Sequence, residues 1–323
     1  MRRGDGVTSE KENGQAPRGD EGPVHEGTVA RPGCYRATWR HQVVFRGLPA
    51  SAVRFAAASR LARMFEFDTD TALSAHEDGW RGTVTDRWNV GPIPNGGYVA
   101  AIGATAIAAV ASHPDPISVT THFLRPAVPG PVHVAASVVR TGRAHTWLQA
   151  SLVQEDNDIA RMMAIFGNLD TAGPTFVTGE VPVLPDPATL VSSQSLPEVF
   201  SLARRFDMRL DPATAGGAMG SPTGTPEMAG WIRFADGREP DARSLVLCAD
   251  AMPPPVLNLM PTAWVPTLEY TVHIRARPAR GWLRGRFRTR FLTDGLLEED
   301  GELWDAEDRL VALSRQLARV RPG

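Results

Sequence analysis

Three polar residues in the second half of the chain stand among apolar neighbours, where they could do chemistry. Asp250 lies within the apolar run 245–252, and a lone carboxylate there is costly unless it is hydrogen-bonded or used. Gln316 lies in the strand-like run 310–320, and its amide could orient a water because it both donates and accepts. Thr267 opens another strand-like run, and its hydroxyl could bond a carboxylate or a water. Together they offer a carboxylate and two groups that could bind it or a water, which makes them candidates for a catalytic site.

Each of these residues also has a structural explanation. Asp250 could be a cap or an ion-paired residue near a helix end, because Pro253 follows closely and would stop the helix. Gln316 could face solvent from an edge strand, and Thr267 could simply satisfy strand propensity. These alternatives stay open for each residue taken alone, so the catalytic hypothesis depends on the three together.

A pair of glycines adds a fourth feature. Gly96 and Gly97 precede the run 98–111, which is apolar on all sides and is typical of a buried helix. The backbone N–H groups of Gly96, Gly97 and Tyr98 could stabilise an oxyanion, with help from the helix dipole, and we place this role first on Gly97 or Tyr98. The glycines could equally serve a tight turn and close packing.

The elements around these residues form two similar halves. In the first half the pattern predicts the buried helix and these strands: 80–90, 118–125, 132–140, 145–155 and 160–167. In the second half it predicts a helix over 241–252 that contains Asp250, and these strands: 226–234, 268–275, 281–291 and 309–320. One helix followed by an antiparallel meander predicts an α+β layer with the sheet wrapped around the helix.

The two halves match at a nearly constant offset. The motif that starts at His122 recurs from His273, at an offset near 151, which indicates a duplicated unit. The chain then divides into an N-terminal extension that is disordered or dispensable, a first domain, a linker and a second domain: 1–63, 64–170, 171–190 and 191–323.

This register shows where the halves differ. The first half has no acid near Val99, the counterpart of Asp250, and it has Phe166 near the counterpart of Gln316. We therefore expect the carboxylate and the glutamine of the site to come from the second half, not the first.

Composition argues against several classes of function. The formal net charge is −2 and the pI is near 6.5, so no basic field favours nucleic acid. No apolar run is long enough to span a membrane as a helix. Lys11 is the only lysine and lies in a polar tail, which leaves Schiff-base chemistry and a phosphate-binding loop without their lysine.

Cysteine and histidine usage points away from a metal or a disulfide framework. Cys34 and Cys248 are far apart in sequence, and we interpret Cys248 as a small core residue. The histidines show no spacing typical of zinc ligands, so no metal or other cofactor is predicted. A reduced, cytoplasmic setting fits this pattern.

Several segments of the chain resemble those of a known family. The segment from Trp88 through Pro94-Asn95-Gly96-Gly97-Tyr98 resembles the first-helix signature of acyl-CoA thioesterase II (TesB-like) proteins, and so does the segment 121–126, Thr-His-Phe-Leu-Arg-Pro. The stretches around Thr267 and Gln316 resemble two further segments of that family. The resemblance covers roughly residues 65–320. It departs from the family at Pro253-Pro254-Pro255 and in the Gly/Pro-rich stretch 211–225, either of which could reshape the pocket.

The resemblance carries expectations about fold and function. It implies a double hotdog fold, in which two antiparallel sheets each wrap around a central helix and pack as a pseudo-dimer. It implies hydrolysis of acyl-CoA thioesters to fatty acid and CoA. The water-holding roles would fall on Asp250, Thr267 and Gln316. The substrate would be the partner, and further pairing into a homo-oligomer stays open.

Two other functions remain compatible with the residues. The first is an acyl-CoA or lipid-binding protein that has the same apolar channel but does not activate water. The second is a hotdog dehydratase or hydratase acting on acyl thioesters. Such chemistry usually needs an acid paired with histidine, and neither predicted helix carries such a pair.

Overall fold

Helix α2 (Gly96–Val110) is the centre of the first half of the fold. The structure is a computed structural model that describes residues 64–196, 200–260 and 265–320. Alanines, which favour helix, make up much of α2, and Asn95 caps its start by accepting a hydrogen bond from the Tyr98 N–H. The helix is apolar on all sides and most of it is buried, as predicted for 98–111.

The strands of the first half form an antiparallel sheet that packs on α2. They are β1 (Ser74–His76), β2 (Gly79–Val84), β5 (Asp115–Phe123), β6 (Gly130–Thr141), β7 (Thr146–Gln154) and β8 (Asn157–Gly167). Smaller elements precede α2: α1 (Glu66–Asp70), a 3-10 turn at Asp86–Trp88, and the paired β3 (Asn89–Val90) and β4 (Ile93–Pro94). The strand predicted over 80–90 therefore ends at Val84.

The second half repeats this pattern with shorter helices. Its helices are α3 (Ser201–Arg205) and α4 (Leu245–Cys248), and its strands are β9 (Phe206–Leu210), β10 (Glu227–Phe234), β11 (Thr267–Ile274), β12 (Leu283–Arg288), β13 (Leu292–Thr293), β14 (Leu296–Trp304) and β15 (Leu310–Arg319). Strands β9, β13 and β14 are absent from the predicted set. The others agree with it to within a few residues.

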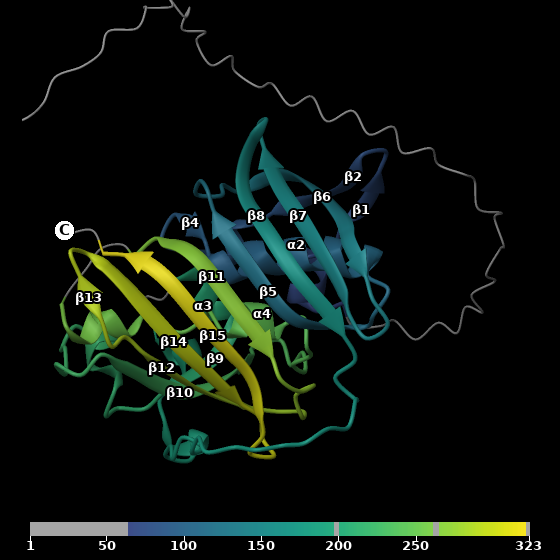
Figure 1. Ribbon diagram of the computed structural model, residues 1–323. Helices are drawn as coiled ribbons and strands as arrows, with labels where there is room; N and C mark the ends of the chain where they lie inside the picture. The colour runs from purple at the N-terminus through teal and green to yellow at the C-terminus, as the bar shows by residue number, and fades with distance from the viewer. Residues whose placement is uncertain (1–63, 197–199, 261–264, 321–323) are drawn as a thin grey trace, which may run out of the picture. The chain divides into compact units, whose positions relative to one another are not determined.

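The strand order is the same in both halves. It runs β2-β6-β7-β8-β5 in the first and β10-β12-β14-β15-β11 in the second, with every pairing antiparallel. Only β6, β7 and β8 form the predicted meander, because β5 lies beyond β8 rather than beside β6. Strands β5 and β11 pair with each other and join the halves into one sheet (Figure 1).

The registers show the repeat in detail. Thr120 lies opposite Thr271 at the junction of β5 and β11, and their hydroxyls are 2.9 Å apart. These two residues are 151 positions apart, the offset found in the sequence. The ladder of β5 with β8 is interrupted between Pro116 and Ser118, and that of β11 with β15 between Thr267 and Glu269. The two irregularities are related by the same offset.

Helix α4 is shorter than predicted. The helix expected over 241–252 contains only Leu245–Cys248, with Ala249 as its C-cap, so Asp250 follows the helix instead of lying inside it. The prolines at 253–255 cannot continue a helix, and the residue before a proline avoids the helical conformation. Asp250 therefore lies in a turn, where its side chain is free to approach α2.

The remaining predictions concern the ends and the linker. The extension 1–63 lies outside the described residues. The stretch 171–190 contains no strand or α-helix, only a 3-10 turn at Pro187–Thr189. No helix within the described ranges is both long and apolar enough to cross a membrane. Cys248 is buried in the core, and burial raises the pKa of its thiol to about 12.

Candidate active site

The carboxylate of Asp250 is held by groups from both halves of the chain. Gln316 Nε2 on β15 donates to Oδ1 at 2.7 Å. The Gly97 N–H at the start of α2 donates to Oδ2 at 2.6 Å. Asn95 Nδ2 donates to Oδ2 at 3.0 Å and to the Asp250 main-chain oxygen at 2.9 Å. The helix cap thus also positions the carboxylate, at the end of α2 where the helix dipole favours an anion.

The two glycines permit this close approach. A Cβ added to Gly97 would lie 2.8 Å from Asp250 Cβ, closer than side chains tolerate. A Cβ on Gly96 would lie 3.0 Å from the Phe123 ring and 3.2 Å from Asp250 Oδ2. Glycine is therefore needed at 97 so that the turn after α4 can contact the end of α2.

Thr267 and Gln316 form a chain that ends on Asp250. Thr267 Oγ1 donates to Gln316 Oε1 at 2.7 Å, and Gln316 is buried while Thr267 is partly exposed. The irregularity between Thr267 and Glu269 is the kind of bulge that redirects a side chain near an active site. The structure therefore brings together the three residues that the sequence singled out.

The amides proposed for an oxyanion are used differently. The Gly97 N–H binds Asp250, and the Tyr98 N–H donates to Asn95 Oδ1 at 3.0 Å. The Tyr98 side chain is buried, and its hydroxyl donates to the Asp70 main-chain oxygen. Within the described residues, the Gly96 N–H has no hydrogen-bond partner, so it is the amide of the three that could meet a ligand.

The electrostatics suit a base that works near neutral pH. Burial raises the pKa of Asp250 to about 6, although the hydrogen bonds from Gly97, Gln316 and Asn95 favour the ionised form. The residue keeps part of its surface accessible. A carboxylate with this pKa is ionised at pH 7 and can take a proton from water.

Two residues of the site, Asn95 and Glu299, are not predicted from the sequence. Asn95 is a common N-cap type, and no sequence signal separates its second role from capping. Glu299 lies on β14, which was not predicted, and its Oε1 accepts from Gln316 Nε2 at 3.3 Å. Burial and the negative charge of Asp250 raise the pKa of Glu299 to about 8.

Comparison with known proteins places the chain in a family. A model of the acyl-CoA thioesterase N-terminal domain matches residues 84–167, and a model of the acyl-CoA thioesterase C-terminal domain matches residues 178–320. The chain belongs to the acyl-CoA thioesterase II (TesB-like) family. Its membership supports thioesterase activity in general and an acyl-CoA as the class of substrate.

Relatives of this TesB-like chain include proteins of solved structure and proteins that are uncharacterised. A protein from Thermobifida fusca, provisionally classed as a thioesterase II, is 31% identical with a TM-score of 0.75, covering 80% of this chain and 99% of that one. A hot dog fold protein of unknown function from Alicyclobacillus acidocaldarius is 24% identical with a TM-score of 0.73, covering 80% and 99%, and shows the hotdog fold. An uncharacterised protein of Mycobacterium tuberculosis is 27% identical over 75% of this chain and 90% of its own length.

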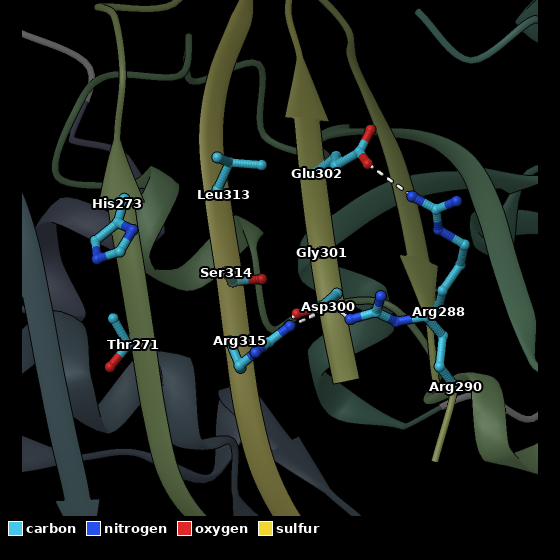
Figure 2. Close-up of a pocket in the computed structure, with 10 residues that line it drawn as sticks. All are labelled: Thr271, His273, Arg288, Arg290, Asp300, Gly301, Glu302, Leu313, Ser314 and Arg315. Atoms are coloured by element: carbon cyan, nitrogen blue, oxygen red, sulfur yellow. Dashed lines mark hydrogen bonds and ion pairs between the residues drawn. The ribbon is translucent and has the colours of Figure 1, made fainter. Parts of the chain in front are cut away.

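A surface pocket lies on the other face of the same strands. It has a volume of about 460 Å³ and is lined by residues of β11, β12, β14 and β15, among them Asp300 and Arg315 (Figure 2). Side chains alternate along a strand, so Asp300 and Arg315 point away from the face that carries Glu299 and Gln316. The arginines of the pocket are already paired with its carboxylates, as the dashed contacts of Figure 2 show for Arg315.

One further cluster could hold a metal ion. His76 and His133 both contact the same oxygen of Asp78, at 2.7 and 3.0 Å, and the three ligand atoms lie within 4.8 Å of one another. Strand pairing brings together two histidines that are far apart in sequence, so their spacing gave no zinc signal. The cluster lies on the β1–β2 hairpin and β6, and none of its three residues hydrogen-bonds to Asp250.

Proposed function

We propose that this chain hydrolyses acyl-CoA thioesters to free acid and CoA, with Asp250 as the general base. The observation that carries the proposal is the set of contacts on Asp250, which is bound by Gln316 and Gly97, ionised at neutral pH and still partly accessible. Family membership supports the thioester as the bond that is cleaved.

In the proposed reaction Asp250 removes a proton from water as the water oxygen attacks the thioester carbon. Gln316 fixes the carboxylate, and the Thr267 hydroxyl, which donates to Gln316, keeps lone pairs that can accept from the water. The Gly96 N–H stabilises the oxyanion, with the dipole of α2 behind it. The C–S bond then breaks, and the proton held by Asp250 passes to the CoA thiolate.

We propose further that the chain is a double hotdog made of two domains, 64–170 and 191–323, joined by the linker 171–190. The matching strand orders and the paired Thr120 and Thr271 support a pseudo-two-fold axis at the β5–β11 junction. Helix α2 fills the centre of one layer. The site draws on both proposed domains, since Asp250 meets Asn95 and Gly97.

Thiol release from a panel of acyl-CoAs tests the function. We expect free CoA from acetyl-, hexanoyl- or palmitoyl-CoA with the wild-type chain, and Asp250→Asn should lower kcat by about 10²–10⁴. An unchanged circular dichroism spectrum and retained acyl-CoA binding would show that the variant is folded. Binding without thiol release by the wild type would favour the non-catalytic alternative. Loss of water from a 3-hydroxyacyl-CoA would favour the dehydratase, and addition of water to an enoyl-CoA would favour the hydratase.

A further inference from the structure

Glu299 is a second carboxyl group beside the proposed base. Gln316 Nε2 carries two hydrogens, and it contacts Asp250 Oδ1 at 2.7 Å and Glu299 Oε1 at 3.3 Å. Glu299 is only 7% exposed. The two carboxyl groups thus lie within hydrogen-bond reach of one nitrogen, in a setting where two negative charges would repel each other strongly.

The fold itself does not require an acid at this position. The rung across β11, β15 and β14 consists of Tyr270, Gln316 and Glu299. The equivalent rung across β5, β8 and β7, counted from the matching irregularities, consists of Val119, Ala164 and Leu148. All three are buried and apolar. The same architecture therefore packs with leucine where the second half has a glutamate.

The surroundings of Glu299 hold little to balance a charge. Asp250 and the buried Tyr270 lie on its side of the sheet, and Cys248 is in the same core. Burial holds the pKa of Tyr270 well above its usual value, so its hydroxyl is neutral. On its own strand, Asp300 points to the opposite face, where it pairs with Arg315 and Arg290.

The arginines of the neighbouring strands are also turned away. Arg288 on β12 binds Glu302 on the outer face, and Arg315 on β15 binds Asp300 there (Figure 2). Within the described residues, the Glu299 side chain has one hydrogen bond, which it accepts from Gln316. A neutral carboxylic acid is the form that fits this setting.

We propose that Glu299 is a positioning residue of the site, a neutral acid that holds the second N–H of Gln316 and leaves Asp250 as the one anion. This proposal rests on the proposed function. When Glu299 ionises, a second negative charge enters a buried site whose transition state builds charge on an oxyanion, so hydrolysis slows. The pKa of about 8 places this loss above neutral pH. The pH–rate profile is then bell-shaped, and its two limbs report the titration of Asp250 and Glu299 as a coupled pair.

The test compares pH profiles of kcat/KM on the acyl-CoA that the wild type hydrolyses fastest, corrected for spontaneous hydrolysis. The wild type should lose about tenfold per pH unit above the alkaline midpoint. Glu299→Gln keeps the oxygen that accepts from Gln316 but cannot ionise. It should lower the rate at pH 7 by about threefold and remove the alkaline limb, while the acid limb stays in place.

Two further variants separate position from charge. Glu299→Leu copies the residue of the first half, so it should fold. It loses the acceptor as well, and the rate at pH 7 should fall about tenfold, the effect of one lost hydrogen bond. The matched control is Asp300→Asn, one residue along on the opposite face, which should keep both limbs. An alkaline limb in Glu299→Gln equal to that of the wild type would overturn the proposal.

Infrared difference spectroscopy tests the same proposal without substrate. Titration of the full chain from pH 7 to pH 10 should remove a carboxylic-acid C=O band that Glu299→Gln lacks. Absence of that band at pH 7 would show that Glu299 is ionised and would overturn the inference. If the wild type shows the band but releases no thiol from any acyl-CoA, the proposed function fails while the protonation of Glu299 stands.

Discussion

The two carboxylate oxygens of Asp250 accept hydrogen bonds from different parts of the chain. Gln316 binds Oδ1 from the sheet, whereas Gly97 and Asn95 bind Oδ2 from the end of α2. Burial raises the pKa of Asp250, whereas all three donors lower it, and the resulting pKa is about 6. Removing any one donor should therefore weaken the acid and shift the pH at which activity begins.

The hydrogen bond from Gln316 should set the pH at which hydrolysis begins. In the wild type, kcat/KM should fall about tenfold per pH unit below the acid midpoint near pH 6, as Asp250 becomes protonated. Gln316→Ala should move that midpoint to higher pH, since a hydrogen bond to the ionised form is lost. Thr267→Val, which does not contact the carboxylate, should lower the rate without moving the midpoint. A midpoint that stays fixed in Gln316→Ala would contradict the assignment.

Glu299 leads to a prediction about stability. Its pKa is about 8 in the folded chain and about 4.5 when unfolded, so both states hold the proton below pH 4.5. Between these values only the unfolded state ionises, and the folded state loses stability as pH rises, by on the order of 3 kcal/mol at pH 7. Glu299→Gln should therefore unfold at a higher temperature than the wild type at pH 7.5, and the difference should shrink toward pH 5.

Asp300→Asn provides a contrast of opposite sign. The hydrogen bond from Arg315 holds the pKa of Asp300 below its usual value, so this group stabilises the folded state above the unfolded pKa. Its replacement should slightly lower the melting temperature at pH 7.5. Equal shifts for the two variants, measured by differential scanning calorimetry, would argue against a neutral Glu299.

Which residues could be predicted depends on their neighbours in sequence. Asp250 and Gln316 stand out because apolar residues surround them, and the structure places them in contact. Glu299 lies in the run Glu298-Glu299-Asp300, which looks like a solvated charged segment. Only the pairing of β14 with β15 turns one of these three acids inward. A single sequence holds no signal for that choice.

At the scale of elements, the contact between the end of α2 and the turn after α4 sets the geometry. Gly97→Ala would place a methyl group 2.8 Å from Asp250 Cβ, so the turn must move and the hydrogen bond from the Gly97 N–H must lengthen. We expect kcat to fall by about tenfold or more. Gly173→Ala, where an added Cβ meets nothing, is the matched control. Unchanged thiol release by Gly97→Ala would show that this contact is dispensable.

Long apolar or alternating segments were predicted well at this scale, and mixed ones were not. The long apolar run of helix α2 and the strand patterns of β5 to β8 are each compatible with few other types of secondary structure. Strand β14 is not predicted because its sequence is rich in acidic residues and contains Gly301. Acidic residues and glycine are both depleted in strands. Helix α4 was predicted too long because apolar spacing continues past Cys248, although the prolines end the helix.

At the scale of the whole chain, the β5–β11 ladder makes the described residues share one sheet. Neither strand is an edge, because β8 and β15 flank the pair on the outside. Separating the halves would expose two unpaired strands and the buried contacts between α2 and α4. The order of strands could not be predicted from a meander pattern, since the position of β5 depends on a pairing between residues 151 positions apart.

We expect one unfolding transition for the two halves as a consequence. Calorimetric and van't Hoff enthalpies should agree, and tryptophan fluorescence should change together with circular dichroism. Trp147 on β7, whose ring contacts His145 and Arg140, reports on the first half and Trp304 on the second, so single-tryptophan variants can follow each separately. Two well-separated midpoints would show that the junction does not couple the halves.

The placement of Asn95 and Gly97 against Asp250 also limits how such chains can diverge. A chimera that joined the first half of this protein to the second half of a distant relative would inherit a carboxylate from one parent and its amide cradle from the other. The active site then works only if the two halves are matched to each other. Exchange of one half by recombination should therefore be tolerated far less than a substitution on the outer face of the sheet.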